Sequence, residues 1–395
     1  MLKLGKIIEF FTSVLLIFAF SFPRVLPNIK IAMLAILLGL VLISKRLNPQ
    51  AFQRIFIYAL FFIVPILAAS IYGNQQDYIV SLFKVYFLFP AMLIIIFQVF
   101  DRQTFYRILY KAASISLVII TLVSLTTLLQ GLGYFPVNVN AYFYEDEDRI
   151  GLNEGYIHII NSPLSYYLFL IPIVFNNGKN FDFTNKKLYF FIALFIFSIL
   201  TGRRILLLPF IIIIVAHFRK FYKLFLVGIV IGFLFLSSSG NKFENFDIGF
   251  VFDRFKSAIN NEGDSAVREE QSNYFEKYIS ERPIAGYGLG SYMGSYLRND
   301  LSKTAYERSY HYLVFTVGIP FAIVLFGYYI YLLYSMWRYG NGSDLNKGIF
   351  IGLVSLLLAS YTNPYWLSSF DYTIPFAILI VLSLQPHIWK KFSVS

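Results

Sequence analysis

One of the four histidines stands where a long polar segment gives way to an apolar run. His311 follows Glu307 and Arg308, and a strongly apolar stretch begins there. A partly exposed histidine titrates near neutral pH and can act as a general base. The alternative interpretation is a histidine that is hydrogen-bonded for structural reasons. His311 is therefore the first candidate for a catalytic residue.

Several cations lie beside apolar runs, where charge is costly and is usually functional or paired. Arg203 and Arg204 are adjacent between two such runs, although they could also form the polar tip of a hairpin. A guanidinium group fits phosphate oxygens bidentately. Lys84 lies inside an apolar run, where it could snorkel to the surface or face an anion. The other candidate anion-binding residues are Arg149, Arg268, Arg282 and Arg308.

Together these residues predict an anion-binding site with one general base at one end of the protein. Such a site suits a lipid-linked phosphate or pyrophosphate. A metal is not expected, because the chain has no cysteine and its histidines are scattered. Asp146 and Asp148 could hold a divalent ion, but a solvated acidic loop is the preferred interpretation. No phosphate-binding loop for ATP occurs. The Gly286-x-Gly288-x-Gly290 pattern lacks the final glycine of a dinucleotide fingerprint, so it predicts a flexible turn and no cofactor.

Composition sets the class of protein that must position these residues. The chain has 395 residues, of which 57% are hydrophobic and 14% charged. This excess of apolar residues excludes a disordered chain and favours an all-α polytopic membrane protein. Solid apolar runs such as 205–216 and 224–236 are not typical of a β-barrel, in which polar and apolar residues alternate. The net charge of +11 does not indicate nucleic-acid binding, because most basic residues lie in short loops between apolar runs.

A helix needs about 20 apolar residues to cross a bilayer, and about twelve spans are predicted. The N-terminal apolar stretch, 7–22, has no cleavage site behind it and is taken as part of the first span. The predicted spans are 5–22, 26–44, 54–72, 79–99, 108–130, 156–175, 187–202, 204–217, 221–238, 310–335, 346–362 and 370–388.

Lysines and arginines in the short loops set the predicted orientation. With a cytoplasmic N-terminus, most basic residues fall on the inside, and both termini are cytoplasmic. The short outside loops hold only Arg24, Lys30, Arg149, Arg203 and Arg204. The predicted organisation is a membrane domain over 1–238, a periplasmic segment over 239–309 and a second membrane domain over 310–395. In the periplasmic segment, an apolar stripe predicts an amphipathic helix over 267–282 on the outer membrane boundary. The stripe consists of Val267, Tyr274, Phe275, Tyr278 and Ile279.

The chain resembles the O-antigen polymerase and O-antigen ligase superfamily (Wzy-type and related enzymes). Nearly the whole layout takes part: about a dozen spans, with one large outside segment before the last few. Four short patterns carry the resemblance, and their order is more specific than any one of them. They are Arg149-Ile-Gly151-Leu-Asn153 with Asn161, Thr201-Gly202-Arg203-Arg204, Arg268 with the later Pro283-to-Gly290 turn, and His311-Tyr312-Leu313 with Gly318. One departure is Tyr312, where the family often has asparagine.

The resemblance implies a GT-C-like, metal-independent glycosyltransferase in the bacterial inner membrane, with its active site on the periplasmic face. Its substrate would be an undecaprenyl-pyrophosphate-linked oligosaccharide, and a chain-length regulator protein is an expected partner. His311 would be the base, and Arg203, Arg204 and Arg268 would hold the pyrophosphate, with Arg149 and Lys84 as weaker candidates. Polymerase and ligase share these patterns, so both remain open. A lipid-linked oligosaccharide transporter would need repeat symmetry and midplane charges, and a scaffold would leave the predicted anion-binding site unexplained.

Overall fold

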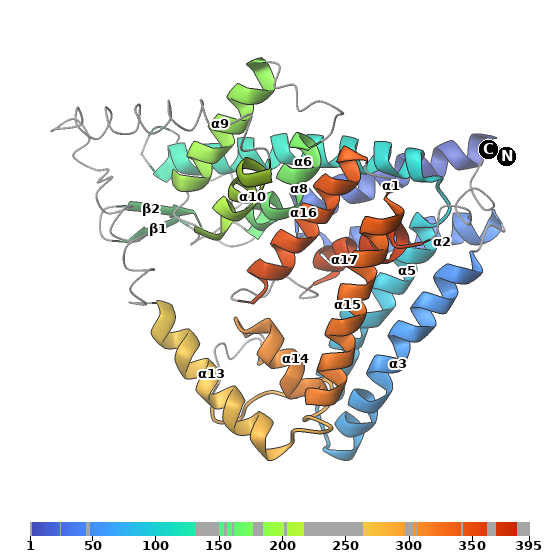
Figure 1. Ribbon diagram of the computed structural model, residues 1–395, viewed down its shortest axis with the longest axis vertical. Helices are drawn as coiled ribbons and strands as arrows, with labels where there is room; N and C mark the ends of the chain where they lie inside the picture. Colours follow the sequence, from blue (N-terminus) through green and yellow to red (C-terminus); the bar gives the residue numbers. More distant parts are fainter. Residues whose placement is uncertain are drawn as a thin grey trace.

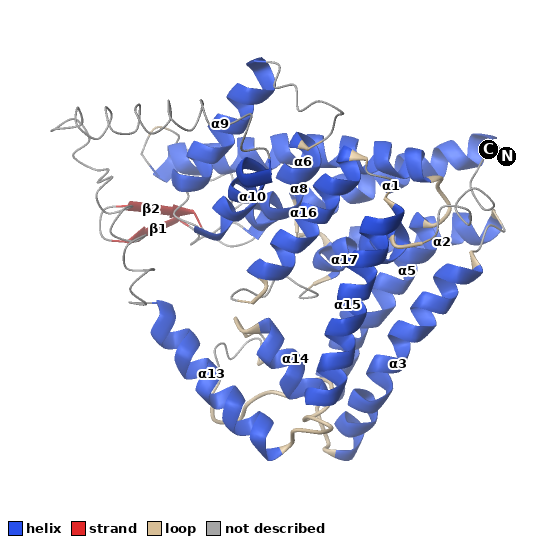
Figure 2. Ribbon diagram, viewed as in Figure 1, coloured by secondary structure: helices blue, strands red, loops and turns tan. Residues whose placement is uncertain are grey.

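The computed structural model describes fourteen stretches of the chain. They are 2–23, 25–44, 48–131, 134, 150–153, 156–159, 162–176, 185–200, 204–216, 264–296, 303–304, 306–340, 343–361 and 369–384. In these stretches the protein is helical apart from one small hairpin (Figures 1 and 2).

The helices follow the apolar runs of the sequence. In chain order they are α1 (Leu2–Ser21), α2 (Pro27–Ile43), α3 (Pro49–Ile71), α4 (Gln76–Phe83), the π-helical turn η1 (Lys84–Leu88), α5 (Phe89–Phe97), α6 (Arg102–Gly131), the 3-10 turn η2 (Ser162–Tyr166), α8 (Tyr167–Phe175), α9 (Asn185–Leu200), the 3-10 turn η3 (Arg204–Leu207), α10 (Leu208–Ala216), α13 (Asp264–Glu281), α14 (Ser309–Val317), α15 (Ile319–Tyr339), α16 (Asp344–Ala359) and α17 (Phe370–Leu382).

In the described part of the chain, five helical stretches are long and apolar enough to cross a membrane. They are Leu4–Ser21, Pro49–Ile71, Gln76–Phe97, Arg102–Gln130 and Ile319–Tyr339. Shorter apolar helices accompany them at Pro27–Ile43, Pro163–Phe175, Lys187–Ile199, Ile205–Val215 and Phe370–Leu382. These lengths are compatible with a multi-pass membrane protein. The ninth predicted span, 221–238, lies outside the described residues.

Helices α8 and α17 form the centre of the core. Every residue of both helices is buried, which is typical of helices that are apolar on all sides. Helix α8 packs on α16, α6 and α10, and α17 packs on α5 and α15. The helices around them expose large apolar side chains, including Phe56 and Ile323, as expected for surfaces that face lipid.

Loops that the charge pattern assigns to the same side meet at the same end of the bundle. At one end, Arg54 and Arg102 donate to the last carbonyls of α17, Ser383 and Leu382. At the other end, the loop after α3 meets the turn after α13, because Asn74 donates to the carbonyls of Tyr287 and Leu289.

Two of the predicted spans are not single continuous helices. The sixth, predicted as a helix over 156–175, begins with a strand: β2 (Tyr156–Ile159) pairs antiparallel with β1 (Ile150–Asn153). Isoleucine and tyrosine favour a strand, and the helical part starts only at η2 and α8. The tenth, 310–335, is divided at Gly318, whose φ of 82° ends α14 before α15 begins. Left-handed backbone of this kind favours glycine.

Candidate functional site

Helix α13 buries its apolar stripe against the protein itself. Phe275 is fully buried, and its ring contacts those of Tyr306, Tyr312 and Phe315 in a small aromatic core. The predicted amphipathic helix over 267–282 is therefore confirmed to within a few residues, as α13. The described part of its apolar face packs on α14 and on the loop before α14, while contact of this helix with a membrane surface stays a prediction.

The turn that follows α13 is held by close backbone contacts. Gly286, Gly288 and Gly290 all have positive φ, and a Cβ atom at Gly288 would lie 2.3 Å from the backbone nitrogen of Ala69 in α3. The N–H of Gly288 donates to the carbonyl of Thr316 at 3.0 Å, and that of Leu289 donates to Pro65 at 2.9 Å. The glycines predicted as a flexible turn do form a turn, but it is a packed one that joins α13, α14 and α3.

Two polar contacts connect α13 to the start of α14. The Nε atom of Arg268 lies 2.8 Å from Oε2 of Glu307 in a partly exposed ion pair. One turn later, Oε1 of Gln271 accepts the backbone N–H of Arg308 at 2.9 Å. Arg308 is the residue that precedes the first turn of α14, so Gln271 satisfies one of the backbone donors that a helix start leaves open. Residues from two helices are thereby fixed beside His311.

His311 lies in the first turn of α14, between two aromatic rings. Its imidazole centroid is 6.1 Å from that of Phe275 and 6.0 Å from that of Tyr361. The side chain is partly exposed, but its Nδ1 atom is buried and has no hydrogen-bond partner among the described residues. Burial, and secondarily the charge of Arg308, lower the pKa of His311, while Glu276 opposes this shift. The imidazole is therefore neutral at pH 7, as a general base must be.

Two more buried nitrogen atoms lie unpartnered in the same cluster, Nε of Arg308 and Nε2 of Gln271. The guanidinium of Arg308 lies over the ring of Tyr361, 4.9 Å from its centroid. Gln271 is almost completely buried, whereas Tyr361 is 49% exposed. A buried polar atom without a partner is costly in a native protein. Together with Nδ1 of His311, these two nitrogen atoms make this cluster the candidate ligand site.

Arg282 lies apart from this cluster, at the end of α13. Its guanidinium is held between two aromatic rings, 3.9 Å from the centroid of Tyr72 and 4.6 Å from that of Tyr287. Ile71, which precedes Tyr72, and Ile284, two residues after Arg282, are largely exposed. Stacking of this kind uses the faces of a guanidinium and leaves its N–H edge available for an anion.

The remaining predicted site residues are not brought to the cluster by any described contact. Lys84 is exposed at the start of η1, and no hydrogen bond or ion pair in the described structure joins it to His311. Arg149 and Arg203 lie outside the described residues, as do Asp146 and Asp148. Arg204 begins η3, but its side chain is also outside what is described. Within the described residues no group of three or more metal-binding side chains occurs.

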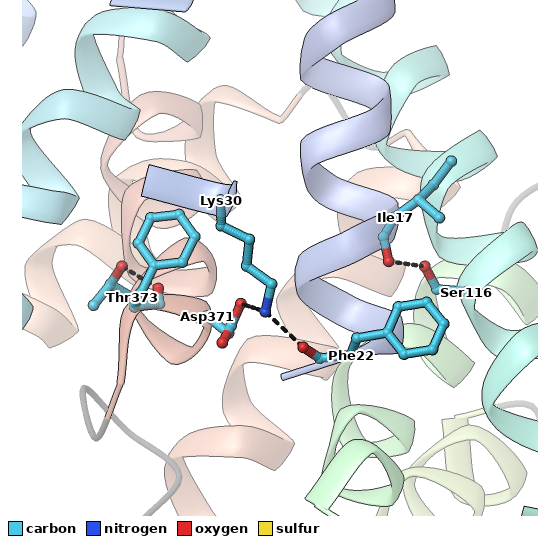
Figure 3. A network of polar contacts seen from close by, with 7 residues as sticks. Ile17, Phe22, Lys30, Ser116, Asp371 and Thr373 are labelled. Atoms are coloured by element: carbon cyan, nitrogen blue, oxygen red, sulfur yellow. Dashed lines mark hydrogen bonds and ion pairs between the residues drawn. The ribbon is translucent and has the colours of Figure 1, made fainter. Parts of the chain in front are cut away.

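A second polar pair lies among the helices, and sequence reasoning missed it. Lys30, which was counted with the outside-loop cations although it falls within the predicted span 26–44, lies in the first turn of α2 and is 1% exposed. Its Nζ atom lies 2.7 Å from Oδ1 of Asp371 in α17 and donates to the carbonyl of Phe22 at 2.6 Å (Figure 3). In the sequence, Asp371 is only a single acidic residue beside an apolar run, and nothing indicates that Lys30 is its partner.

Gln271 and Tyr361 were also missed, although Gln271 carries a readable signal. It lies three residues after Arg268 and four before Phe275, so all three share one helix face. Tyr361 follows α16, and only the fold brings it to His311. No protein-family model matches this chain, and comparison with curated proteins finds no match. The family resemblance in the sequence therefore stays a prediction.

Proposed function

We propose that the protein is a membrane glycan polymerase. It would transfer a growing chain from its lipid pyrophosphate carrier to the next lipid-linked repeat unit. The observation that carries this proposal is the neutral His311, whose buried Nδ1 has no partner, beside Arg308 and Gln271. The apolar helices around the cluster suit a substrate with a lipid tail. About twelve spans, a periplasmic site and cytoplasmic termini belong to the same proposal.

The reaction needs one base and one anion site. The acceptor hydroxyl oxygen attacks the anomeric carbon of the donor sugar, and His311 takes the hydroxyl proton. The bond from the anomeric carbon to the pyrophosphate oxygen breaks, and the carrier pyrophosphate leaves with the electron pair. This direct displacement inverts the anomeric configuration. Guanidinium groups that hold the pyrophosphate stabilise the charge that grows on it.

The described arginines divide between these two tasks. Arg268 is neutralised by Glu307, so in our proposal it mainly orients the start of α14. Arg282 has the stacked guanidinium and the exposed apolar neighbours that suit a lipid pyrophosphate. Arg203 and Arg204, which the resemblance assigns to the same group, complete the proposed anion site. Arg149 and Lys84 remain weaker candidates.

One observation favours a transporter as the second candidate. A charged pair buried among membrane helices often marks a transport path, and Lys30 with Asp371 is such a pair. Both residues, however, lie in the first turns of their helices. Transporters place such charges near the bilayer midplane, so the position of this pair fits a structural role better.

The test uses purified protein in vesicles with lipid-pyrophosphate-linked repeat units from the source cells. A ladder of longer glycans on the lipid, formed without divalent metal, supports the polymerase. Transfer only to added lipid A core sugars would indicate a ligase instead. Movement of intact lipid-linked units across the bilayer, with no new glycosidic bond, would establish the transporter and overturn the proposal.

A further inference from the structure

The buried nitrogen atoms around His311 differ in what they can bind. The amide oxygen of Gln271 must face the N–H of Arg308, because only the oxygen can accept that hydrogen bond. The orientation of the amide is therefore fixed, and its Nε2 is a donor with no partner. Nε of Arg308 is a second donor. Nδ1 of neutral His311 is an acceptor when the proton is on Nε2.

Each of the two arginines in this cluster has a carboxylate near it. Arg268 is paired with Glu307, and the charge of Arg308 is opposed at His311 by that of Glu276. A pyrophosphate would offer only acceptors and several negative charges, and it would find no excess of cations here. A hydroxyl group both donates and accepts. Two donors, one acceptor and arginines with carboxylates near them thus suit a neutral ligand with hydroxyl groups.

A half-exposed aromatic ring belongs to the cluster. Tyr361 is half exposed, and its ring lies beside both His311 and the guanidinium of Arg308. Such a ring offers an apolar face that the C–H face of a sugar can cover. The combination of an exposed ring with buried hydrogen-bonding atoms is typical of a site that orients a small polar ligand.

We propose that Gln271, Arg308 and Tyr361 form the subsite for the acceptor sugar, which they hold with one hydroxyl at Nδ1 of His311. The inference rests on the proposed function, and it assigns the lipid pyrophosphate to a different place, near Arg282. Gln271 becomes a binding residue as well as the anchor of α14. Its two atoms have separate tasks: Oε1 holds the helix start and Nε2 binds the sugar.

Gln271→Glu separates these tasks. The carboxylate keeps an oxygen for the N–H of Arg308 but loses the donor. We expect KM for the acceptor to rise about ten-fold, as for the loss of one hydrogen bond in a buried site. KM for the donor lipid should stay unchanged. The melting temperature should fall, because the new carboxylate is buried, so KM is measured at a temperature at which the variant is folded. Gln271→Ala, which removes both atoms, should also lower the melting temperature. Asn273→Asp, an exposed position on the same helix, is the matched charge control and should behave as wild type.

A binding measurement keeps this inference separate from the polymerase proposal. The probes are neutral oligosaccharides released from lipid-linked repeat units and inorganic pyrophosphate, each titrated onto the full chain in nanodiscs. Weaker oligosaccharide binding in Gln271→Glu, with pyrophosphate binding unchanged, supports the subsite even if no polymer forms in vesicles. Wild-type binding and kinetics in Gln271→Glu would overturn the inference and reduce Gln271 to an anchor. Loss of pyrophosphate binding instead would also overturn it.

Discussion

Two of the buried polar clusters in the described part of the chain differ in how completely they are satisfied. In the pair of Lys30 and Asp371, the ammonium has two oxygen partners within hydrogen-bond distance and both side chains are almost fully buried. In the cluster around His311, three buried nitrogen atoms have no partner and the imidazole is partly exposed. The first cluster binds α2 to α17. The second connects α13 to α14 and is left incomplete.

This difference separates a structural role from a functional one. A closed ion pair fixes which helices meet, and breaking it leaves an uncompensated charge. An incomplete cluster carries a cost that a folded protein tolerates where a ligand restores the missing bonds. Substitutions in the first cluster should therefore change stability, and those in the second should change activity. The predictions below test this division.

His311→Ala should have the largest effect. Removal of a general base typically lowers the rate about 10²–10⁴-fold, so long glycan chains should disappear while membrane insertion and melting temperature stay normal. His217→Ala and His387→Ala are controls, because the sequence predicts both at the opposite side of the membrane. If glycan chains grow normally in His311→Ala, His311 is not the general base.

Lys30→Ala should destabilise the protein without a specific effect on catalysis. An unpaired buried carboxylate costs about 3–5 kcal/mol, which can be measured by helical circular dichroism during titration with a denaturing detergent. The double variant Lys30→Met with Asp371→Leu removes both charges and should recover most of the loss. If the double variant folds normally but is inactive, the pair of Lys30 and Asp371 has a function, and its assignment as purely structural is wrong.

Gly288→Ala tests the turn that holds α13 against α14 and α3. A residue with φ of 83° and a Cβ atom close to the backbone of Ala69 should lose about 1–3 kcal/mol or more of stability. Gly327→Ala is the matched control, because nothing lies within 4 Å of its added Cβ in α15. This control should gain about 0.5–1 kcal/mol from its helical position. Equal stability of the two variants would contradict the proposed role of this turn in holding α13 against α14 and α3.

The sequence predicted local features well and distant partners poorly. The apolar runs gave most helix positions, and the stripe on α13 was read from residues three and four apart. Lys30 was counted with the basic residues of the outside loops because it lies near the start of the predicted span 26–44. Its acid lies more than three hundred residues away, and no local pattern encodes that contact. Tyr361 reaches His311 for the same reason, through the packing of α16.

The break at Gly318 shows a further limit. Hydropathy does not distinguish one long helix from two short ones, because both are equally apolar. The decision lies in backbone geometry: Gly318 approaches the carbonyl of Ile284 so closely that no side chain fits. That close approach depends on the turn after α13, which the sequence placed only as a loop. His311, Arg268 and Arg308 were thus named one by one from the sequence, while Gln271, Tyr361 and the arrangement of the cluster required the fold.

The smallest expected effect concerns the pH dependence of the reaction. Only neutral His311 can accept a proton, so the rate should rise as pH increases through its pKa and then level off. Since burial and Arg308 lower that pKa, the half-maximal rate should fall below pH 6.5, the ordinary histidine value. Arg308→Gln removes a charge that lowers the pKa and should move the midpoint upward. Glu276→Gln removes a charge that raises it and should move the midpoint downward. Both shifts should be under about one pH unit, because these charges are partly exposed.

Opposite shifts cannot arise from a general loss of stability, which would change the rate without moving the midpoint in two directions. If both variants move the midpoint the same way, a group other than His311 controls the acid limb, and the incomplete cluster is not the site of proton transfer.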